Sequence, residues 1–348
     1  MNYIYILLIL FTSVSCANKN SKVEQLFSVK KDLIGETILS EPDILAPIEV
    51  YVTSNSDILF TENQNNYFAA IIDKQNANKL IRICPIGKGP DEYLPPLFFS
   101  RNKRKNSVSF FAPRVHKFYS FDLYSEDSIN FKLRNEYSGF KNANQLVRVN
   151  DTLFFSTMAN SSIATDRYGL YNIDGELLYS DISYPKNNSQ EISDNLKTIA
   201  FQSSIAVNPD NGYIVTACKF VGHMEIMSVG TSGINKIFEL QTLEGRFENK
   251  SQGKFMSLKP SSDSPISYLC IDATKDFIYL LYSGRTIEKF GKQKAFMGNT
   301  ILKFNWSGQA IEQLTLEHDI ISFSVSDNSL YAIGLDTSIP KLFKYNIQ

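Results

Sequence analysis

The chain is a series of short apolar runs separated by tight turns of Asn, Asp and Gly. Aromatic and β-branched residues are frequent in these runs, and no long stretch has the 3.6-residue period of an amphipathic helix. Short apolar runs bounded by turn residues are typical of an all-β protein. Several all-β architectures consist of repeated units, and this chain contains such an internal repeat.

A unit of four strands recurs along the chain. Its first half is an apolar strand, a tight turn and a second apolar strand. A third strand follows each of these halves, and a fourth strand follows in all units but the last. The six first halves span residues 49–60, 97–111, 145–155, 204–215, 268–282 and 320–333.

The sixth unit has only three strands, the third at residues 341–348, while a spare apolar strand at 33–39 precedes the first unit. If the spare strand completes the last unit, the units form a closed ring without open edges. We therefore predict a six-bladed β-propeller with four-stranded blades, closed by an N-terminal strand in the last blade. A two-domain β-sandwich is the alternative, but it explains neither the missing last strand nor the spare first one.

The first fifteen residues have the layout of a secretory signal peptide, with an apolar run at 3–11 followed by small residues. The run is too short to span ~30 Å of hydrocarbon, which needs about 20 residues. Cys16 follows directly, and this arrangement resembles the lipobox of bacterial lipoproteins, in which the cysteine is lipidated. The resemblance implies a signal peptide at 1–15, a lipidated tether at 16–30 and the propeller at 31–348. An ordinary cleaved signal peptide is the alternative.

The charge balance excludes two classes of partner. Thirty-five basic and thirty-six acidic residues leave a net charge of −1, so no basic excess is available to hold nucleic acid or an anionic membrane. We expect membrane contact through the lipid anchor only. The three histidines are too few for a His-rich metal site, and we expect neither a metal nor a cofactor.

The remaining cysteines, Cys84, Cys218 and Cys270, lie in predicted strands or at strand ends. Buried, unreactive thiols are the favoured interpretation. An exported protein can form disulfides, so one internal pair stays open as the alternative.

Three motifs resemble those of the TolB-like six-bladed propeller lipoproteins that are common in Bacteroidetes. They are PIGKGPDEY at 85–93, YLLYSGRT at 279–286 and ILKFNWSGQ at 301–309. The resemblance implies the fold and a location in the cell envelope, but no particular activity. Family members bound for the outer surface usually carry acidic residues after the cysteine. Residues 17–20 contain none, which favours the periplasmic side.

Propeller topology places the loops that join strands two to three and four to one on the same face. These loops are long in this chain, and we call that end the long-loop face. Long loops on a rigid scaffold are where function usually lies, so we predict ligand binding there. The candidate ligand-binding residues on this face are Lys88, Asp91, Glu92, Tyr93, Arg114, His116, Arg167, His223, Arg285 and Lys289.

Arg114, Arg167 and Arg285 come from three blades and could form a positive rim for a carboxylate, a phosphate or an acidic sugar. The alternative is that each arginine pairs with a nearby Asp or Glu. In GKGPDEY a proline follows the glycines and no GK[ST] is present, so a structural corner is favoured over a phosphate site. In that corner, Glu92 is expected to cap backbone amides.

No GxSxG, HExxH or Asp-box motif occurs in the chain. The absence of catalytic motifs favours a non-enzymatic module that binds a protein, a peptide or a glycan, with an anionic partner suggested by the arginines. The alternative is a hydrolase or lyase with a central pocket on the same face.

Overall fold

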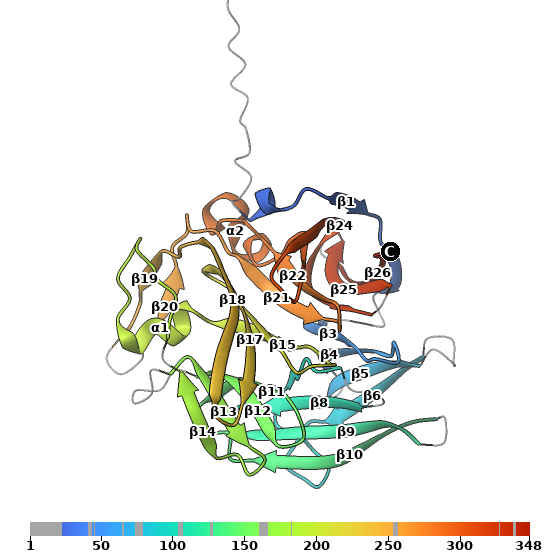
Figure 1. The fold of residues 1–348 in the computed structure, drawn as a ribbon. Coiled ribbons are helices and arrows are strands. Elements are labelled where there is room, and N and C mark those ends of the chain that lie inside the picture. The colour runs from blue at the N-terminus through green and yellow to red at the C-terminus, as the bar shows by residue number, and fades with distance from the viewer. Residues whose placement is uncertain are drawn as a thin grey trace, which may run out of the picture.

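The computed structural model of the protein describes residues 23–40, 44, 46–64, 66–73, 79–103, 107–125, 128–159, 166–181, 183–252, 257–326, 328–336 and 339–348. Cys16 and the signal peptide lie outside these residues, so export and lipidation stay predictions. The described chain is almost entirely β-structure, arranged as a ring of blades (Figure 1).

Four blades are separate antiparallel sheets of four strands each. Each uses consecutive strands of the chain, as the repeat predicts. Blade 1 is β3 (Glu49–Val52), β4 (Ile58–Gln64), β5 (Tyr67–Asp73) and β6 (Lys79–Pro85); blade 2 is β7 (Phe98–Phe99), β8 (Ser107–Ala112), β9 (Lys117–Ser125) and β10 (Ser128–Ser138); blade 3 is β11 (Ala143–Arg148), β12 (Leu153–Met158), β13 (Tyr168–Asn172) and β14 (Leu177–Asp181); blade 4 is β15 (Ser203–Val207), β16 (Ile214–Cys218), β17 (Gly222–Gly230) and β18 (Gly233–Leu243).

The last two blades are joined because one long strand serves both. The first part of β24 (Ala310–Val325) pairs with β23 as far as Thr315, and its second part pairs with β25 from Ile320 onward. Blade 5 is thus β21 (Tyr268–Ala273), β22 (Phe277–Tyr282), β23 (Gly298–Asn305) and the start of β24; blade 6 is the end of β24, β25 (Ser329–Asp336), β26 (Ile339–Asn346) and β2 (Glu36–Ser40).

The N-terminal strand closes the ring. β2 pairs antiparallel with β26, with Glu36 opposite Lys344 and Ser40 opposite Lys341. The predicted six-bladed architecture and its closure are therefore confirmed. The predicted strand 33–39 is in fact two strands, because Leu33 belongs to β1 (Lys30–Leu33), which adds to the outer edge of β24 in parallel.

Apolar side chains fill the gaps between neighbouring blades. Six hydrophobic clusters lie among the described residues in this way, one at each junction from blades 1 and 2 round to blades 6 and 1. Between blades 2 and 3, for example, the Phe118 and Phe154 ring centroids are 5.1 Å apart in an edge-to-face arrangement. The ring is stable because each blade buries its apolar faces against two neighbours.

The long-loop face carries the only described elements outside the blades, apart from the N-terminal segment. These are α1 (Asp194–Ala200), α2 (Ile287–Ala295) and a hairpin of β19 (Phe247–Asn249) and β20 (Leu258–Pro260). The opposite end, where tight turns join strands one to two and three to four, is called the short-turn face below. Among the described residues, no helix combines the length and apolar character that crossing a membrane requires.

Candidate functional site

A wide cavity among the described residues opens on the short-turn face. It has a volume of about 820 Å³, within the range of small-molecule sites. Turns between the first and second strands of all six blades contribute to its wall, so it is the mouth of the central channel, called the funnel below. Its lining residues are Thr53, Ser54, Asn55, Ser56, Asn102, Lys103, Ser107, Arg134, Val149, Pro209, Asp210, Thr274, Lys275, Val325 and Ser326.

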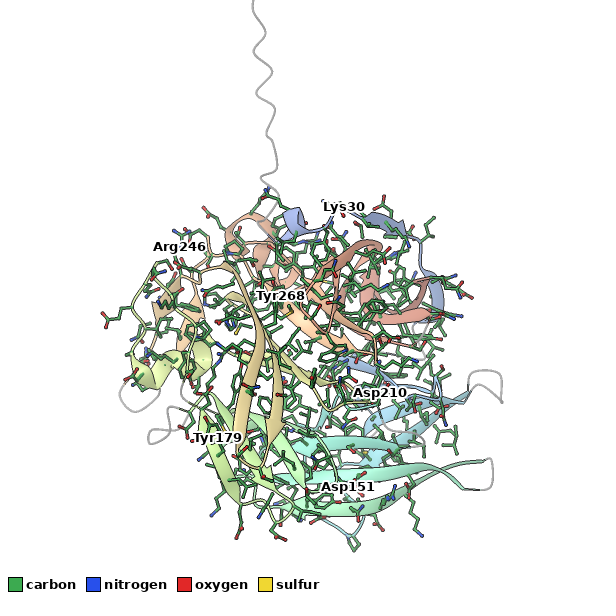
Figure 2. All side chains as sticks on the ribbon, in the orientation of Figure 1. Lys30, Asp151, Tyr179, Asp210, Arg246 and Tyr268 are labelled. Atoms are coloured by element: carbon green, nitrogen blue, oxygen red, sulfur yellow. The ribbon has the colours of Figure 1, made fainter. Side chains whose placement is uncertain are left out.

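The funnel is lined mainly by hydroxyl and amide side chains. Asp210, labelled in Figure 2, lies toward the middle of the ring rather than at its outer edge. Lys103 is paired with Asp272 at 2.7 Å and Arg134 lies 3.6 Å from Asp122, so Lys275 and Asp210 leave the wall close to neutral. Such a wall can exchange hydrogen bonds with a polar ligand.

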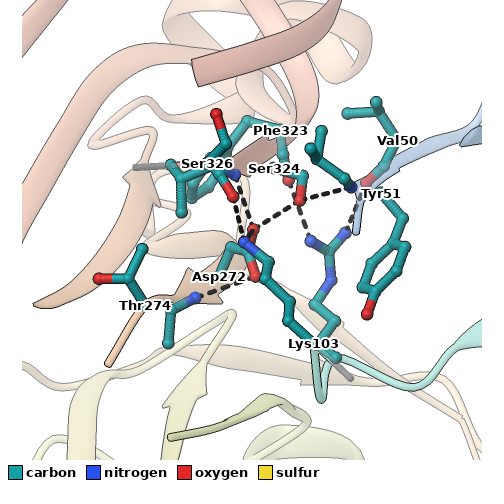
Figure 3. Close-up of polar contacts among 12 residues, drawn as sticks. Val50, Tyr51, Lys103, Asp272, Thr274, Phe323, Ser324 and Ser326 are labelled. Atoms are coloured by element: carbon teal, nitrogen blue, oxygen red, sulfur yellow. Dashed lines mark hydrogen bonds and ion pairs between the residues drawn. The ribbon is translucent and has the colours of Figure 1, made fainter. Parts of the chain in front are cut away.

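The floor of the funnel is closed by two basic residues of blade 2. Lys103 donates from Nζ to Asp272 Oδ2 of blade 5 at 2.7 Å, as Figure 3 shows, and also to the Val325 carbonyl oxygen of blade 6. Two residues before Lys103, Arg101 donates to Glu49 Oε1 of blade 1 at 2.9 Å and to the Phe323 carbonyl oxygen of blade 6 at 3.0 Å. Four blades are thus tied together across the channel.

Asp272 is fully engaged by this network. Its Oδ2 accepts from Ser324 Oγ at 2.6 Å and from the Val325 amide at 2.7 Å, in addition to Lys103. Its Oδ1 accepts from the Ala273 amide at 2.9 Å. Four donors match the roughly four lone-pair sites of a carboxylate, so Asp272 holds the floor together and has no site left for a reacting group.

Part of the long-loop face is covered by its own packed loops. Side chains of α1, β19 and the adjoining segments form a seventh hydrophobic cluster that includes Leu196, Phe201 and Phe247. Two smaller cavities lie at this end, one of about 360 Å³ beside residues 87–94 and one of about 270 Å³ beside α1. Some of the long loops thus pack on one another, and the binding face predicted from loop length stays a prediction.

Arg167 and His223, two of the predicted binding residues, are brought together in a buried network. Arg167 lies 2.7 Å from Glu225 Oε2 and donates to His223 Nδ1 at 3.2 Å, while His223 Nε2 donates to Glu239 Oε1 at 2.8 Å. The exposed side of the network is closed by Lys236, which lies 3.1 Å from Glu225 and 2.8 Å from Glu239.

The pKa values in this network follow from those contacts. Burial, together with the nearby Arg167 charge, lowers the pKa of His223 and keeps the imidazole neutral. Burial would raise the pKa of Glu225, but Arg167 and the other neighbours hold it below its usual range. Hydrogen bonds from Lys236 and His223 lower the pKa of Glu239 to about 2.

His223, Glu225 and Glu239 place ligand atoms within 4.8 Å of one another, a spacing that could hold a metal ion. Both carboxylates, however, are already paired with Arg167 or Lys236. A cation entering here would meet these two positive charges. The donor set therefore fits an internal ion-pair network better than a metal centre.

The other two arginines of the predicted rim lie on the long-loop face, as the topology requires. Arg285 forms a two-pronged ion pair with Asp319, with Nη1 at 2.7 Å from Oδ2. Arg114 donates to the Pro95 carbonyl oxygen at 3.4 Å. Arg167 and Arg285 are each paired with a carboxylate. For these two arginines, pairing with a nearby Asp or Glu is therefore a better description than a shared anion site.

Of the remaining candidates, Lys88, Asp91, Glu92 and Tyr93 line the 360 Å³ cavity together, whereas His116 and Lys289 are not among its lining residues. His116, at the end of the turn before β9, has a left-handed backbone with φ of 55°. Lys289 lies in α2, where its amide donates to the capping Thr286 Oγ1 at 3.2 Å and its Nζ lies 5.4 Å from the centre of the Phe290 ring.

GKGPDEY forms a structural corner, as predicted. Glu92 Oε2 accepts from the Gly89 amide at 2.7 Å, and a Cβ on Gly87 would lie only 1.8 Å from that same oxygen. Tyr93 is buried, with its ring 5.0 Å from the ring of Tyr119. Lys88 and Asp91 are exposed on the rim of the 360 Å³ cavity.

The three remaining cysteines are free thiols. Cys84 and Cys218 are buried and Cys270 is half-buried. Burial raises the pKa of each thiol above its usual value, which makes the reactive thiolate rare. These properties agree with the inert thiols favoured from sequence.

Comparison with known proteins agrees with this geometry. The chain matches the family described as TolB-like 6-blade propeller-like over residues 23–328. It belongs to that family. A search of curated proteins found no match.

Two solved structures show the same fold. A member of the DUF4221 family from Bacteroides vulgatus is 13% identical, with a TM-score of 0.57, 90% of this chain covered and 97% of that chain. A protein from Bacteroides fragilis whose name is "putative exported protein" is also 13% identical, with a TM-score of 0.50, 91% of this chain covered and 98% of that chain. At this identity the likeness concerns the fold alone.

Proposed function

We propose that the protein is a lipid-anchored binding module of the cell envelope, facing the periplasm, and that it holds a polar ligand of glycan or peptide chemistry in the funnel. The observation that carries the proposal is the 820 Å³ mouth of the channel, to which all six blades contribute side chains. Short turns at the ends of inner strands are rigid, and a preformed wall lowers the entropy cost of binding.

The composition of the wall supports a binding role over catalysis. Hydroxyl and amide groups dominate it, and the buried carboxylate at its floor, Asp272, is saturated by the protein's own donors. A glycoside hydrolase needs a pair of carboxylates with access to substrate, and Asp210 is the single carboxylate among the described residues that line the funnel. The signal-peptide layout, Cys16 and the name of the exported relative from Bacteroides fragilis support the envelope location.

The test is calorimetric titration of the mature protein with defined probes: neutral and acidic oligosaccharides, and neutral and acidic peptides. Ser54, exposed at the mouth of the funnel, is changed to Trp so that the indole occupies the cavity. Lys88→Trp places the same bulk at the cavity of the long-loop face. We expect a probe that binds the native protein to lose at least tenfold in affinity with Ser54→Trp and to keep its affinity with Lys88→Trp.

Two outcomes would count against the proposal. Loss of binding with Lys88→Trp alone would move the site to the long-loop face, as the loop lengths suggested. Mass spectrometry of each probe after incubation provides the second check, because cleavage of a bound probe would establish the enzyme alternative.

A further inference from the structure

The first described segment of the chain, residues 23–34, lies along the outer edge of the ring and is called the strap below. Two buried side chains hold it in place: Val23 and Phe27 pack in the cluster between blades 4 and 5, and the Phe27 ring centroid is 5.1 Å from that of Phe304. Beyond them, β1 pairs with β24 from Lys30 opposite Gln313 to Leu33 opposite Leu316. The strap is therefore a fixed part of the propeller surface.

Three large apolar side chains of the strap are exposed, interspersed with exposed polar residues. Leu26 and Val29 are each 46% exposed, and Ile34 is 84% exposed, the highest value among the large hydrophobic side chains of the described residues. Single exposed apolar residues are ordinary. Three within nine positions of one ordered segment, next to a predicted lipid anchor, call for an apolar partner.

The length of the chain before the strap limits what that partner can be. Seven Cα–Cα steps separate Cys16 from Val23, and at ~3.5 Å each they reach at most about 24 Å. A globular chain of ~320 residues has a radius of gyration of about 20 Å and hence a diameter of about 50 Å. A lipid on Cys16 thus cannot bring the far edge of the ring, at β10 and β14, to the bilayer while the strap stays ordered (Figure 1).

We propose that Leu26, Val29 and Ile34 enter the interfacial layer of the membrane beside the lipid anchor, so that the propeller lies on its edge. The inference rests on the proposed lipid attachment at Cys16. In the strap, Glu24 and Asp32 balance Lys30 and Lys31, and Lys31 lies 2.8 Å from Glu312. Contact is therefore apolar and insensitive to salt, unlike attraction by a basic patch.

An edge-on orientation has a consequence for the funnel. With blades 5 and 6 against the bilayer, the channel axis runs along the membrane plane, and both the short-turn face and the long-loop face remain open to water. A ligand would then reach the funnel from the side, without passing between the protein and the membrane.

The experiment uses the full lipidated chain in vesicles of phosphatidylcholine with 30% phosphatidylglycerol. An environment-sensitive nitrobenzoxadiazole dye is attached to Ile34→Cys, to Leu26→Cys and, as a matched control, to Leu178→Cys. Leu178 is 45% exposed on β14. We expect nitroxide-labelled phospholipids to quench the dyes at positions 26 and 34 at least twofold, in low and high salt alike, and to leave the dye at 178 unchanged. The unsubstituted protein gives the labelling background of Cys84, Cys218 and Cys270.

The outcomes separate the two proposals. Mass spectrometry of the N-terminal peptide shows whether Cys16 carries lipid. Lipid on Cys16 with no quenching at position 34, or with equal quenching at 34 and 178, would overturn the edge-on contact and leave the anchor standing. An unmodified Cys16 in a protein that stays off the vesicles would overturn both.

Discussion

At the floor of the funnel, loss of Asp272 is expected to destabilise the fold more than loss of its ion-pair partner Lys103. Asp272→Ala removes the counter-charge of Lys103, whose side chain is only 8% exposed, and also leaves the Ser324 hydroxyl and two backbone amides without their acceptor. Removing one partner of a buried ion pair costs about 3–5 kcal/mol. Lys103→Met removes one of four donors to Asp272, so the carboxylate stays solvated by the other three, and we expect a cost of about 1–2 kcal/mol.

The assay is thermal unfolding by calorimetry, with urea unfolding as a second measurement. A domain of ~320 residues has an unfolding entropy of roughly 0.7 kcal/mol/K. Asp272→Ala should therefore lower the Tm by about 4–7 °C and Lys103→Met by about 1–3 °C. The double variant should be more stable than Asp272→Ala alone, because it no longer buries an unpaired ammonium group.

Equal Tm losses for the two single variants would refute this reasoning. Two small losses would mean that Lys103 is solvated by water in the absence of Asp272. Two large losses would mean that the three remaining donors do not compensate the buried Asp272 carboxylate. A double variant as unstable as the sum of the two single variants would show that the pair is not coupled.

The other predictions concern the corner, the buried histidine network and ring closure. Gly87→Ala should destabilise the fold by less than about 1.5 kcal/mol, because the exposed Glu92 carboxylate can move away from the new Cβ and loses only its hydrogen bond to the Gly89 amide; Glu92→Ala in the same chain should then add little further loss in urea unfolding. Because the pKa of His223 is lowered in the folded state, the unfolded chain takes up the proton first, so Tm should fall as pH drops below 6.5, and His223→Gln should flatten the curve. The lowered pKa of Glu239 stabilises the fold above pH 4.5, and this contribution should be lost as pH falls toward 2. Because the Glu239 side chain is 41% exposed, Glu239→Gln should change the free energy of unfolding above pH 4.5 by less than ~1 kcal/mol. Deleting residues 17–40 removes the outer strand of blade 6 and should abolish the cooperative transition seen by circular dichroism, whereas a truncated protein with the native Tm would contradict closure by β2.

Most of the fold could be predicted because strand pairing in a propeller is local. Each blade uses consecutive strands of the chain, and short apolar runs bounded by turn residues mark those strands directly. The spare strand before the first unit indicated how the ring closes. β1 was missed because KKDL is largely exposed and contains no apolar run. α2 was missed because its nine residues include Gly291 in a left-handed conformation, with φ of 74°, which interrupts the helical period.

The site was harder to predict because its contacts join distant parts of the chain. Topology correctly placed Arg167 and Arg285 at the same end of the ring, but their carboxylate partners lie in other strands and left no local pattern. Nothing near Lys103 in the sequence indicates that it reaches Asp272 across the channel, 169 residues away. The closure of the ring brings such residues together, so only the complete fold shows that the wider cavity lies on the short-turn face.

The central claim, that a ligand occupies the funnel, is tested most directly by site-specific photo-cross-linking in the cell envelope. A benzophenone amino acid replaces Lys275 at the funnel or, as the matched control, Lys88 at the long-loop face; both lysines are exposed. After irradiation of intact cells, the funnel position should yield a discrete adduct whose mass identifies the ligand, and position 88 should yield none. An adduct at position 88 together with an unmodified protein at position 275 would contradict the account.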